Sequence, residues 1–171
     1  MTEAIPARLI VMGVTGCGKT TVGTLLAGQL GAIFLDGDDF HPPENVAKMR
    51  SGTPLTDQDR WPWLDRLGAV IEQSVADHQR VVLACSALRR VYRDRITAAC
   101  AEPPLFIHLT GGRDLIHARM AARREHYMPV ALLESQIATL EPIEPDEKAI
   151  AVSIDAPADM IVESVLKRLD R

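Results

Sequence analysis

Five short apolar runs alternate along the chain with longer stretches in which apolar residues recur at helical spacing. The runs are continuous and rich in β-branched residues, which is typical of strands that are covered on both faces of a parallel sheet. This alternation predicts βαβ units, and hence an α/β fold with helices on both faces of a five-stranded parallel sheet. The expected strands are Leu9–Met12, Ile33–Leu35, Val81–Cys85, Leu105–Leu109 and Ile150–Ile154.

The amphipathic stretches favour helices, and Pro157 suits the first turn of the last one. Two segments, 36–60 and 126–148, show a less clear alternation of strand and helix; both are polar and both contain proline. In a fold of this kind such segments bind substrates or move as lids. The expected helices lie near 19–30, 44–50, 62–78, 88–99, 113–126, 129–140 and 157–169.

The composition narrows the class of protein. The 171 residues fit one compact domain, and 47% hydrophobic with 25% charged residues is ordinary for a globular protein. A net charge of −4 without a long basic run argues against nucleic acid as a partner. No apolar stretch is long enough to span a bilayer, and the odd number of cysteines, three, favours reduced thiols. We therefore expect one cytoplasmic domain over residues 1–171 with no membrane or nucleic acid partner.

The strongest chemical signal is a complete G-x-x-x-x-G-K-[ST] motif, which follows the first strand and opens the first helix. Glycines let backbone N–H groups point at phosphate oxygens, and the helix N-terminus adds partial positive charge. Lys19 is expected to reach the β- and γ-phosphates of ATP, and Thr20 to offer its hydroxyl to Mg²⁺. A glycine-rich turn that binds nothing is the alternative. The candidate ATP-binding residues here are Gly13, Val14, Thr15, Gly16, Cys17, Gly18, Lys19, Thr20 and Thr21.

An acidic pair, Asp36 and Asp38, follows the second strand. Two carboxylates two residues apart at a strand end can face one crevice, so Asp36 is expected near Mg²⁺ and its waters and Asp38 at the acceptor hydroxyl. A cap or turn cluster that includes Asp39 is the alternative, and whether Asp38 or Asp39 faces the acceptor stays open. The single asparagine, Asn45, is followed by Val46, so the Asn-Lys-x-Asp element of guanine-specific switches is absent.

Together with the P-loop, three further blocks of sequence resemble the gluconokinases, small kinases of the shikimate kinase and nucleoside monophosphate kinase fold. The blocks are F-L-D-G-D-D-F-H-P at 34–42, the stretch with P-L-x-D-x-D-R at 48–64, and C-S-A-L-R-x-x-Y-R-D at 85–94. The resemblance runs over essentially the whole chain. It implies a three-layer α/β/α sandwich with a helical lid, a homodimer, and the conversion of Mg-ATP and D-gluconate to ADP and 6-phospho-D-gluconate.

A gluconate carboxylate and its hydroxyl groups require cationic side chains with hydroxyl or amide partners. The polar segments at 38–64 and 126–148, together with the block at 85–94, supply such side chains. A surface salt bridge is the alternative for Arg60, and a solvated helix face is the alternative for Arg89, Arg90 and Arg93. Trp61 and Trp63 are interpreted as packing residues. The candidate substrate-binding residues are Asp38, His41, Lys48, Arg60, Ser86, Arg89, His126 and Gln136.

The lid is expected at about 123–142. Arg119 and Arg123 lie four residues apart on one helical face, and in related kinases such arginines close over the nucleotide. Arg124 is a weaker candidate, and a basic helix C-terminus is the alternative for all three. Adenine is expected beside the turn that contains Pro157.

These expectations combine into an in-line phosphoryl transfer that depends on positioning and on charge neutralisation, with Lys19, Asp38 and Arg123 as catalytic residues. Two other functions remain open. The chain could be another kinase of this fold that acts on shikimate, a nucleotide or adenylylsulfate, or a non-catalytic nucleotide-dependent switch. Turnover of ATP that depends on a particular metabolite separates the three.

Overall fold

The computed structural model describes residues 4–122 and 130–171. Five parallel strands form one sheet in the order β2-β3-β1-β4-β5, so the strand that precedes the P-loop lies at its centre. The register places Val11 of β1 between Ala84 of β3 and Ile107 of β4. All five predicted strands are confirmed, with ends that differ by no more than one residue. Their bounds are β1 Arg8–Met12, β2 Ile33–Asp36, β3 Val81–Ala84, β4 Leu105–Thr110 and β5 Ala149–Ser153.

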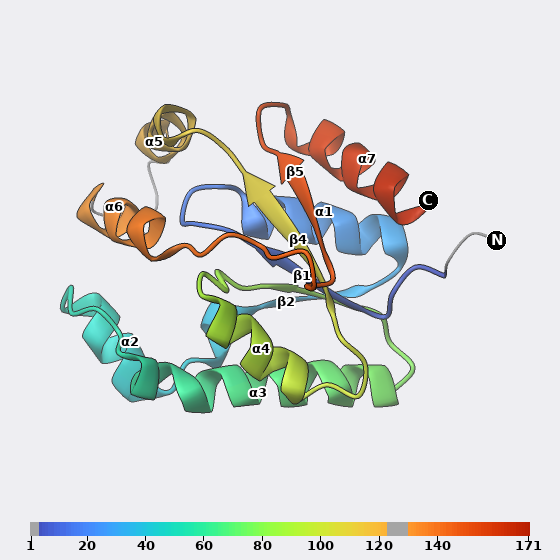
Figure 1. Cartoon of the computed structure of the whole chain (residues 1–171), viewed down its shortest axis with the longest axis horizontal. Coiled ribbons are helices and arrows are strands. Elements are labelled where there is room, and N and C mark those ends of the chain that lie inside the picture. Colours follow the sequence, from blue (N-terminus) through green and yellow to red (C-terminus); the bar gives the residue numbers. More distant parts are fainter. Residues whose placement is uncertain (1–3, 123–129) are drawn as a thin grey trace.

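Helices cover both faces of the sheet, as the alternating pattern predicts (Figure 1). On one face lie α1 (Lys19–Leu30) and α7 (Ala158–Leu169), and on the other α3 (Asp57–Ala76) and α4 (Arg90–Ala98). Successive strand residues point to opposite faces, so Leu9 and Val11 join the core beneath α1 and α7 while Ile10 and Met12 join the core beneath α3 and α4. The three-layer sandwich is therefore confirmed.

The other helices gather on one side of the molecule, around the carboxyl ends of the central strands (Figure 1). In a parallel α/β sheet this is the edge at which ligands bind. No helix in the described part of the chain has both the length and the apolar character needed to cross a membrane. The helices on this side are η1 (Gly37–Phe40), α2 (Pro43–Arg50), α5 (Arg113–Ala122) and α6 (Val130–Thr139).

The start of α3 differs from the expectation. Proline is best tolerated in the first turn of a helix, and this favours a start at Pro62. Instead α3 begins at Asp57, because Thr56 and Asp59 form a capping box in which each side chain accepts a hydrogen bond from the other residue's backbone N–H. Pro62 is accommodated in the second turn. The earlier start places the first turn of α3 beside the acceptor-binding segment.

Candidate active site

The P-loop connects β1 to α1 as the motif predicts. Gly16 adopts a φ of 82°, and a Cβ at this position would lie 2.6 Å from Cγ of Met120 on α5. A larger residue here would therefore have a strained backbone and would force Met120 to move. The Lys19 ammonium donates hydrogen bonds to the carbonyl oxygens of Gly13 at 3.0 Å and Val14 at 3.1 Å. The lysine side chain thus folds back onto the loop, where phosphate oxygens would compete with these carbonyl groups for its ammonium.

Oxygen atoms suited to Mg²⁺ lie beside the P-loop. The Thr20 hydroxyl donates to Oδ2 of Asp36 at 3.4 Å, so the first turn of α1 and the end of β2 present a hydroxyl and a carboxylate side by side. Within residues 4–122 and 130–171 no group of three or more His, Cys, Asp or Glu side chains is arranged to hold a metal. Mg²⁺ at kinase sites takes one or two protein oxygens together with phosphates and waters, so Thr20 and Asp36 fit this ion.

The acidic turn that follows β2 is firmly held. Gly37 packs so closely on β3 that a Cβ would lie 2.6 Å from the carbonyl oxygen of Ala84. The indole Nε1–H of Trp63 donates to the Gly37 carbonyl at 2.8 Å, and the Asp38 N–H donates to Oδ1 of Asp36 at 3.0 Å. These contacts fix the backbone at the point where the Asp38 side chain begins.

The Asp38 side chain itself is 83% exposed, and its charged neighbours are Asp36, Lys19 and Asp39. Desolvation by the surrounding protein raises its pKa, the carboxylate of Asp36 adds to the rise, the ammonium of Lys19 opposes it, and Asp39 contributes a further increase. Because a side chain this exposed keeps much of its water, the neighbouring charges act on Asp38 more strongly than desolvation does. Asp38 therefore lies within electrostatic reach of both Lys19 and Asp36, as expected for a base at the reacting centre.

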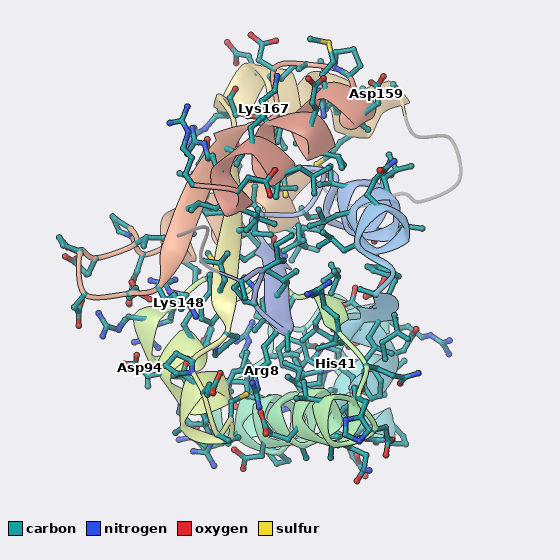
Figure 2. The ribbon with its side chains drawn as sticks, turned by 90° about the vertical axis from the view of Figure 1, so that its right-hand side faces the viewer. Arg8, His41, Asp94, Lys148, Asp159 and Lys167 are labelled. Atoms are coloured by element: carbon teal, nitrogen blue, oxygen red, sulfur yellow. The ribbon has the colours of Figure 1, made fainter. Side chains whose placement is uncertain are left out.

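His41 directly follows this turn and lies on the α3 side of the sheet (Figure 2). Its side chain is 3% exposed, and its ring stacks on Trp63 with centroids 4.0 Å apart and an interplanar angle of 18°. Burial and then the positive charge of Arg60 lower the pKa of His41 to about 4, so the imidazole is neutral at pH 7. Its Nε2 lies 4.0 Å from Oδ1 of Asp38.

Asn45 is a further candidate for the site, and the sequence analysis did not identify it. Its side chain is almost completely buried and its Nδ2 lies 3.3 Å from Nδ1 of His41. The same Nδ2 donates to the backbone carbonyl of Asp59 at 2.9 Å. The spacing of four residues between His41 and Asn45 is the one sequence signal of this contact, and it carries little information alone.

Two residues predicted for the substrate lie against the P-loop. The N–H of Thr15 donates to Oε1 of Gln136 at 2.6 Å, which joins α6 to the loop. The N–H of Gly13 donates to the backbone carbonyl of Ser86 at 3.3 Å. In this state both residues bond to phosphate-loop N–H groups, so their assignment to the acceptor stays a prediction.

The predicted nucleotide residues Arg119 and Pro157 come together. The Arg119 guanidinium donates to the carbonyl oxygens of Ile154 and of Ala156, the latter at 3.2 Å. Pro157 follows directly and caps α7, one residue before the helix begins. Arg119 thereby joins α5 to the turn beside which adenine is expected.

Two of the predicted acceptor-binding arginines line a separate cleft of about 530 Å³ between the N-terminal ends of α3 and α4 and the helix α6. Arg89 pairs with Asp57 at 2.6 Å and with Glu141 at 3.2 Å. Arg60 donates to the carbonyl of Leu55 at 2.8 Å and to the hydroxyl of Tyr92 at 3.3 Å. Its charge also acts on His41, so Arg60 lies between this cleft and the acidic turn.

Lys48 pairs with a carboxylate of α3. Its ammonium contacts both carboxylate oxygens of Asp59, at 2.8 and 3.0 Å. This hydrogen bond, followed by the backbone N–H of Thr56, lowers the pKa of Asp59 to about 2. The pair joins α2 to the first turn of α3, and any role of Lys48 in binding the acceptor stays a prediction.

Arg93 corrects the expectation of a solvated helix face. It is 1% exposed, and its Nε lies 2.6 Å from Oε1 of Glu147. Its Nη1 also donates to the carbonyl oxygens of Ala87 at 2.9 Å and Leu88 at 3.2 Å. Arg93 therefore holds the loop after β3 through two of its backbone carbonyl groups. Three further candidates, Arg123, Arg124 and His126, lie outside the described residues.

Comparison with known proteins shows the family to which the chain belongs. The family model described as shikimate kinase matches residues 15–168. The chain is 44% identical over 181 residues to a "Probable gluconokinase" of Rattus norvegicus, with 96% of this chain and 98% of the relative covered. It is 43% identical over 162 residues to the gluconokinase of Gluconobacter oxydans (strain 621H), with 95% and 90% covered.

A solved structure extends the likeness to three dimensions. The crystal structure of a gluconokinase from Sinorhizobium meliloti 1021 superposes with a TM-score of 0.85 at 41% identity, and the match covers 98% of this chain and 93% of that one. Because the family match and these relatives span nearly the whole sequence, the chain belongs to the shikimate kinase family and, within it, to the gluconokinases.

Proposed function

We propose that this protein transfers the γ-phosphoryl group of ATP to the primary hydroxyl of D-gluconate and so forms ADP and 6-phospho-D-gluconate. The observation that carries the proposal is the convergence of the P-loop lysine, the Thr20–Asp36 pair and the Asp38 carboxylate at one edge of the sheet. The choice of gluconate as the acceptor is supported by the relatives, which are gluconokinases.

The P-loop is proposed to bind the phosphates of ATP through its backbone N–H groups and the N-terminus of α1. Lys19 would exchange its two carbonyl partners for β- and γ-phosphate oxygens. Thr20 and Asp36 would hold Mg²⁺, Asp36 through a water, and when bound this ion neutralises charge on the β- and γ-phosphates. Arg119 and the turn at Pro157 would contact the nucleotide, and Arg123 would add positive charge at the reacting phosphate.

In the transfer step Asp38 is the proposed base. An acceptor oxygen forms a bond to the γ-phosphorus as the bond to the leaving oxygen of ADP breaks, and that oxygen keeps the electron pair. The proton of the acceptor hydroxyl passes to a carboxylate oxygen of Asp38 late in the step. The raised pKa of Asp38 suits this role, because it brings the carboxylate closer to the pH at which a base works best.

The segment 38–64 is proposed to bind gluconate, and the segment 123–142 to act as the lid. Arg60 is the better partner for the gluconate carboxylate than Arg89, because Arg89 already pairs with two carboxylates. Among the described residues Arg60 forms no salt bridge and bonds only to neutral oxygens. Its guanidinium can therefore accept an anionic ligand without the loss of an ion pair.

The proposal also covers the cellular location and the oligomeric state of the enzyme. We expect it to act in the cytoplasm as a homodimer, on the strength of its resemblance to the gluconokinases and its three free cysteines. Light scattering coupled to size exclusion tests the oligomeric state directly, and a monomer at micromolar concentration would contradict it.

The substrate is tested by coupled ADP release with Mg-ATP over a panel of acceptors: gluconate, other aldonates, shikimate, nucleoside monophosphates, adenylylsulfate and no acceptor. Release that requires gluconate is the expected result. Turnover on a different acceptor alone would keep the kinase and remove gluconate as its substrate. Binding of ATP without turnover on any acceptor would instead favour a nucleotide-dependent switch.

A further inference from the structure

We propose that His41 is a positioning residue for the base Asp38. In this assignment Nε2–H of His41 donates a hydrogen bond to Oδ1 of Asp38 once the acceptor is bound, and this turns Oδ2 towards the acceptor hydroxyl. Asn45 holds the imidazole in the tautomer that this bond requires. The proposal deepens the proposed function and rests on it for the reaction, although its tautomer can be tested without any acceptor.

The tautomer follows from the contacts of Asn45. Nδ2 of Asn45 lies 2.9 Å from the backbone carbonyl of Asp59, which can only accept, so the amide nitrogen must face that oxygen. The second hydrogen of this amide points to Nδ1 of His41 at 3.3 Å. Nδ1 must then be an acceptor without a proton. A neutral imidazole with a bare Nδ1 carries its proton on Nε2, the atom that faces Asp38.

The two partners differ in their freedom to move. His41 is 3% exposed, stacked on Trp63 and bonded to Asn45, so its Nε2–H is a fixed donor. Asp38 is 83% exposed and its carboxylate can rotate about its side-chain bonds. At 4.0 Å the two groups do not form a hydrogen bond in this structure. Hydrogen bonds of catalytic groups often tighten only in the ternary complex, and in the proposal a rotation of the exposed Asp38 side chain shortens this distance.

His41 itself is not proposed to transfer a proton. Burial among Trp63, Asn45 and the acidic turn, together with the charge of Arg60, keeps the pKa of the imidazole low and the ring neutral at pH 7. It therefore retains the Nε2 proton throughout, while the acceptor proton goes to Asp38. This differs from a direct contact between His41 and gluconate, because its effect reaches the reaction only through Asp38.

The tautomer is tested first, on the full chain without ligands. In ¹⁵N-labelled protein at pH 7, the ring nitrogens of His41 are assigned by their disappearance in His41→Gln. The expected spectrum shows a protonated Nε2 and an unprotonated Nδ1. A proton on Nδ1 or on both nitrogens would overturn the proposal, whatever acceptor the enzyme uses.

A matched pair of variants tests the function of the donor. The amide nitrogen of glutamine reaches about as far as the imidazole Nε2, whereas the shorter asparagine reaches only about as far as Nδ1. His41→Asn is expected to lower kcat by about 10- to 100-fold with the KM for ATP unchanged, and His41→Gln to restore kcat to within a few-fold of wild type. Circular dichroism is recorded for both variants as the control for folding.

An equal loss of kcat in both variants, or a wild-type kcat in His41→Asn, would overturn the positioning role. Failure of the proposed substrate gives a different result, in which the wild-type chain itself leaves gluconate untouched. In that case the two variants are compared on whichever acceptor the panel identifies, and the tautomer spectrum tests the role of His41 independently of the acceptor.

Discussion

At the scale of single residues, the site depends on a contrast between a rigid backbone and a mobile carboxylate. Gly37 fits tightly against β3, Trp63 bonds to its carbonyl, and Asp36 bonds to the next N–H. Asp38 projects from this fixed turn with its carboxylate open to solvent. Such an arrangement fixes the position of a base while leaving its orientation to be set by the acceptor and by its neighbours.

Replacement of Asp38 tests the base. Asp38→Asn keeps the size of the side chain but cannot accept a proton, so kcat is expected to fall by about 10²- to 10⁴-fold while the dissociation constant for ATP stays within a few-fold of wild type. Asp39→Asn, one residue along the same turn, is the control and should keep most of the activity. Steady-state kinetics measures kcat, and nucleotide titration measures the dissociation constant for ATP. A larger loss in Asp39→Asn would assign the base to Asp39.

The buried imidazole of His41 predicts a dependence of stability on pH. Its pKa lies at about 4 in the folded chain, below the 6.5 of an ordinary histidine, so the unfolded state binds more protons between these values. Stability is therefore fully present above about pH 6.5 and is lost as the pH falls towards 4, by at most about 3 kcal/mol from this group.

Chemical denaturation of wild type and His41→Gln at pH 7 and pH 4.5 isolates this contribution. Other groups, such as His108, whose pKa burial also lowers, act equally in both proteins and cancel in the difference. The wild type is expected to lose more stability on acidification than the variant. Equal losses would mean that His41 titrates normally.

At the scale of elements, the contact between α6 and the P-loop places the helix over the phosphate site before any nucleotide arrives. The hydrogen bond between Thr15 N–H and Gln136 is the direct link, and the N–H of Glu141 bonds to the carbonyl of Leu88 just beyond the helix. Both hydrogen bonds hold the helix in place, and the first of them lies at a position where a phosphate oxygen would compete.

Loss of the Gln136 side chain should expose the loop. In Gln136→Ala without nucleotide, hydrogen exchange at the Thr15 amide is expected to speed up by about 5-fold, the equivalent of one hydrogen bond of about 1 kcal/mol. Gln136→Glu keeps an oxygen acceptor and should exchange at nearly the wild-type rate. Amides of β4 serve as internal references. Unchanged exchange in Gln136→Ala would show that the contact does not hold the loop.

The same elements show what the sequence can and cannot reveal. The strands, the P-loop and most helices are predictable because each leaves a local pattern of apolar residues, glycine or caps. The predicted start of α3 is wrong because the capping box of Thr56 and Asp59 outweighs the preference of Pro62 for a first turn. The contact of Thr15 with Gln136 joins residues that are 121 positions apart, and no local sequence pattern predicts a contact of this kind.

At the scale of the whole molecule, a buried ion pair joins the site to the body of the protein. Arg93 binds Glu147 and the carbonyl oxygens of Ala87 and Leu88. Ala87 has a φ of 46°, a left-handed conformation that costs energy in a residue with a side chain. The adjacent Ser86 accepts the bond from the P-loop residue Gly13. Arg93 thus helps to hold a strained loop against the phosphate site.

Removal of Arg93 should destabilise the fold. Arg93→Ala removes the nearest cationic partner of the buried Glu147 and leaves it with Arg90, 3.8 Å away, and the N–H of Glu144. The free energy of unfolding is expected to fall by about 3 kcal/mol. The control on the same helix is Arg95→Ala. Arg95 pairs with Asp65 at the surface, so its loss should lower the free energy of unfolding far less. Denaturation with urea measures both. Equal small losses would show that the buried pair is not needed for stability.

The primary hydroxyl of gluconate is the proposed acceptor of the phosphoryl group, and the roles of Lys19, Asp38 and His41 all depend on it. The most direct measurement is NMR of the reaction of the wild-type protein with Mg-ATP and D-gluconate labelled with ¹³C at carbon 6. We expect the labelled carbon to acquire coupling to phosphorus, with one phosphate ester formed for each ADP released. ADP released without a phosphate ester, or an ester on a different carbon, would contradict this assignment.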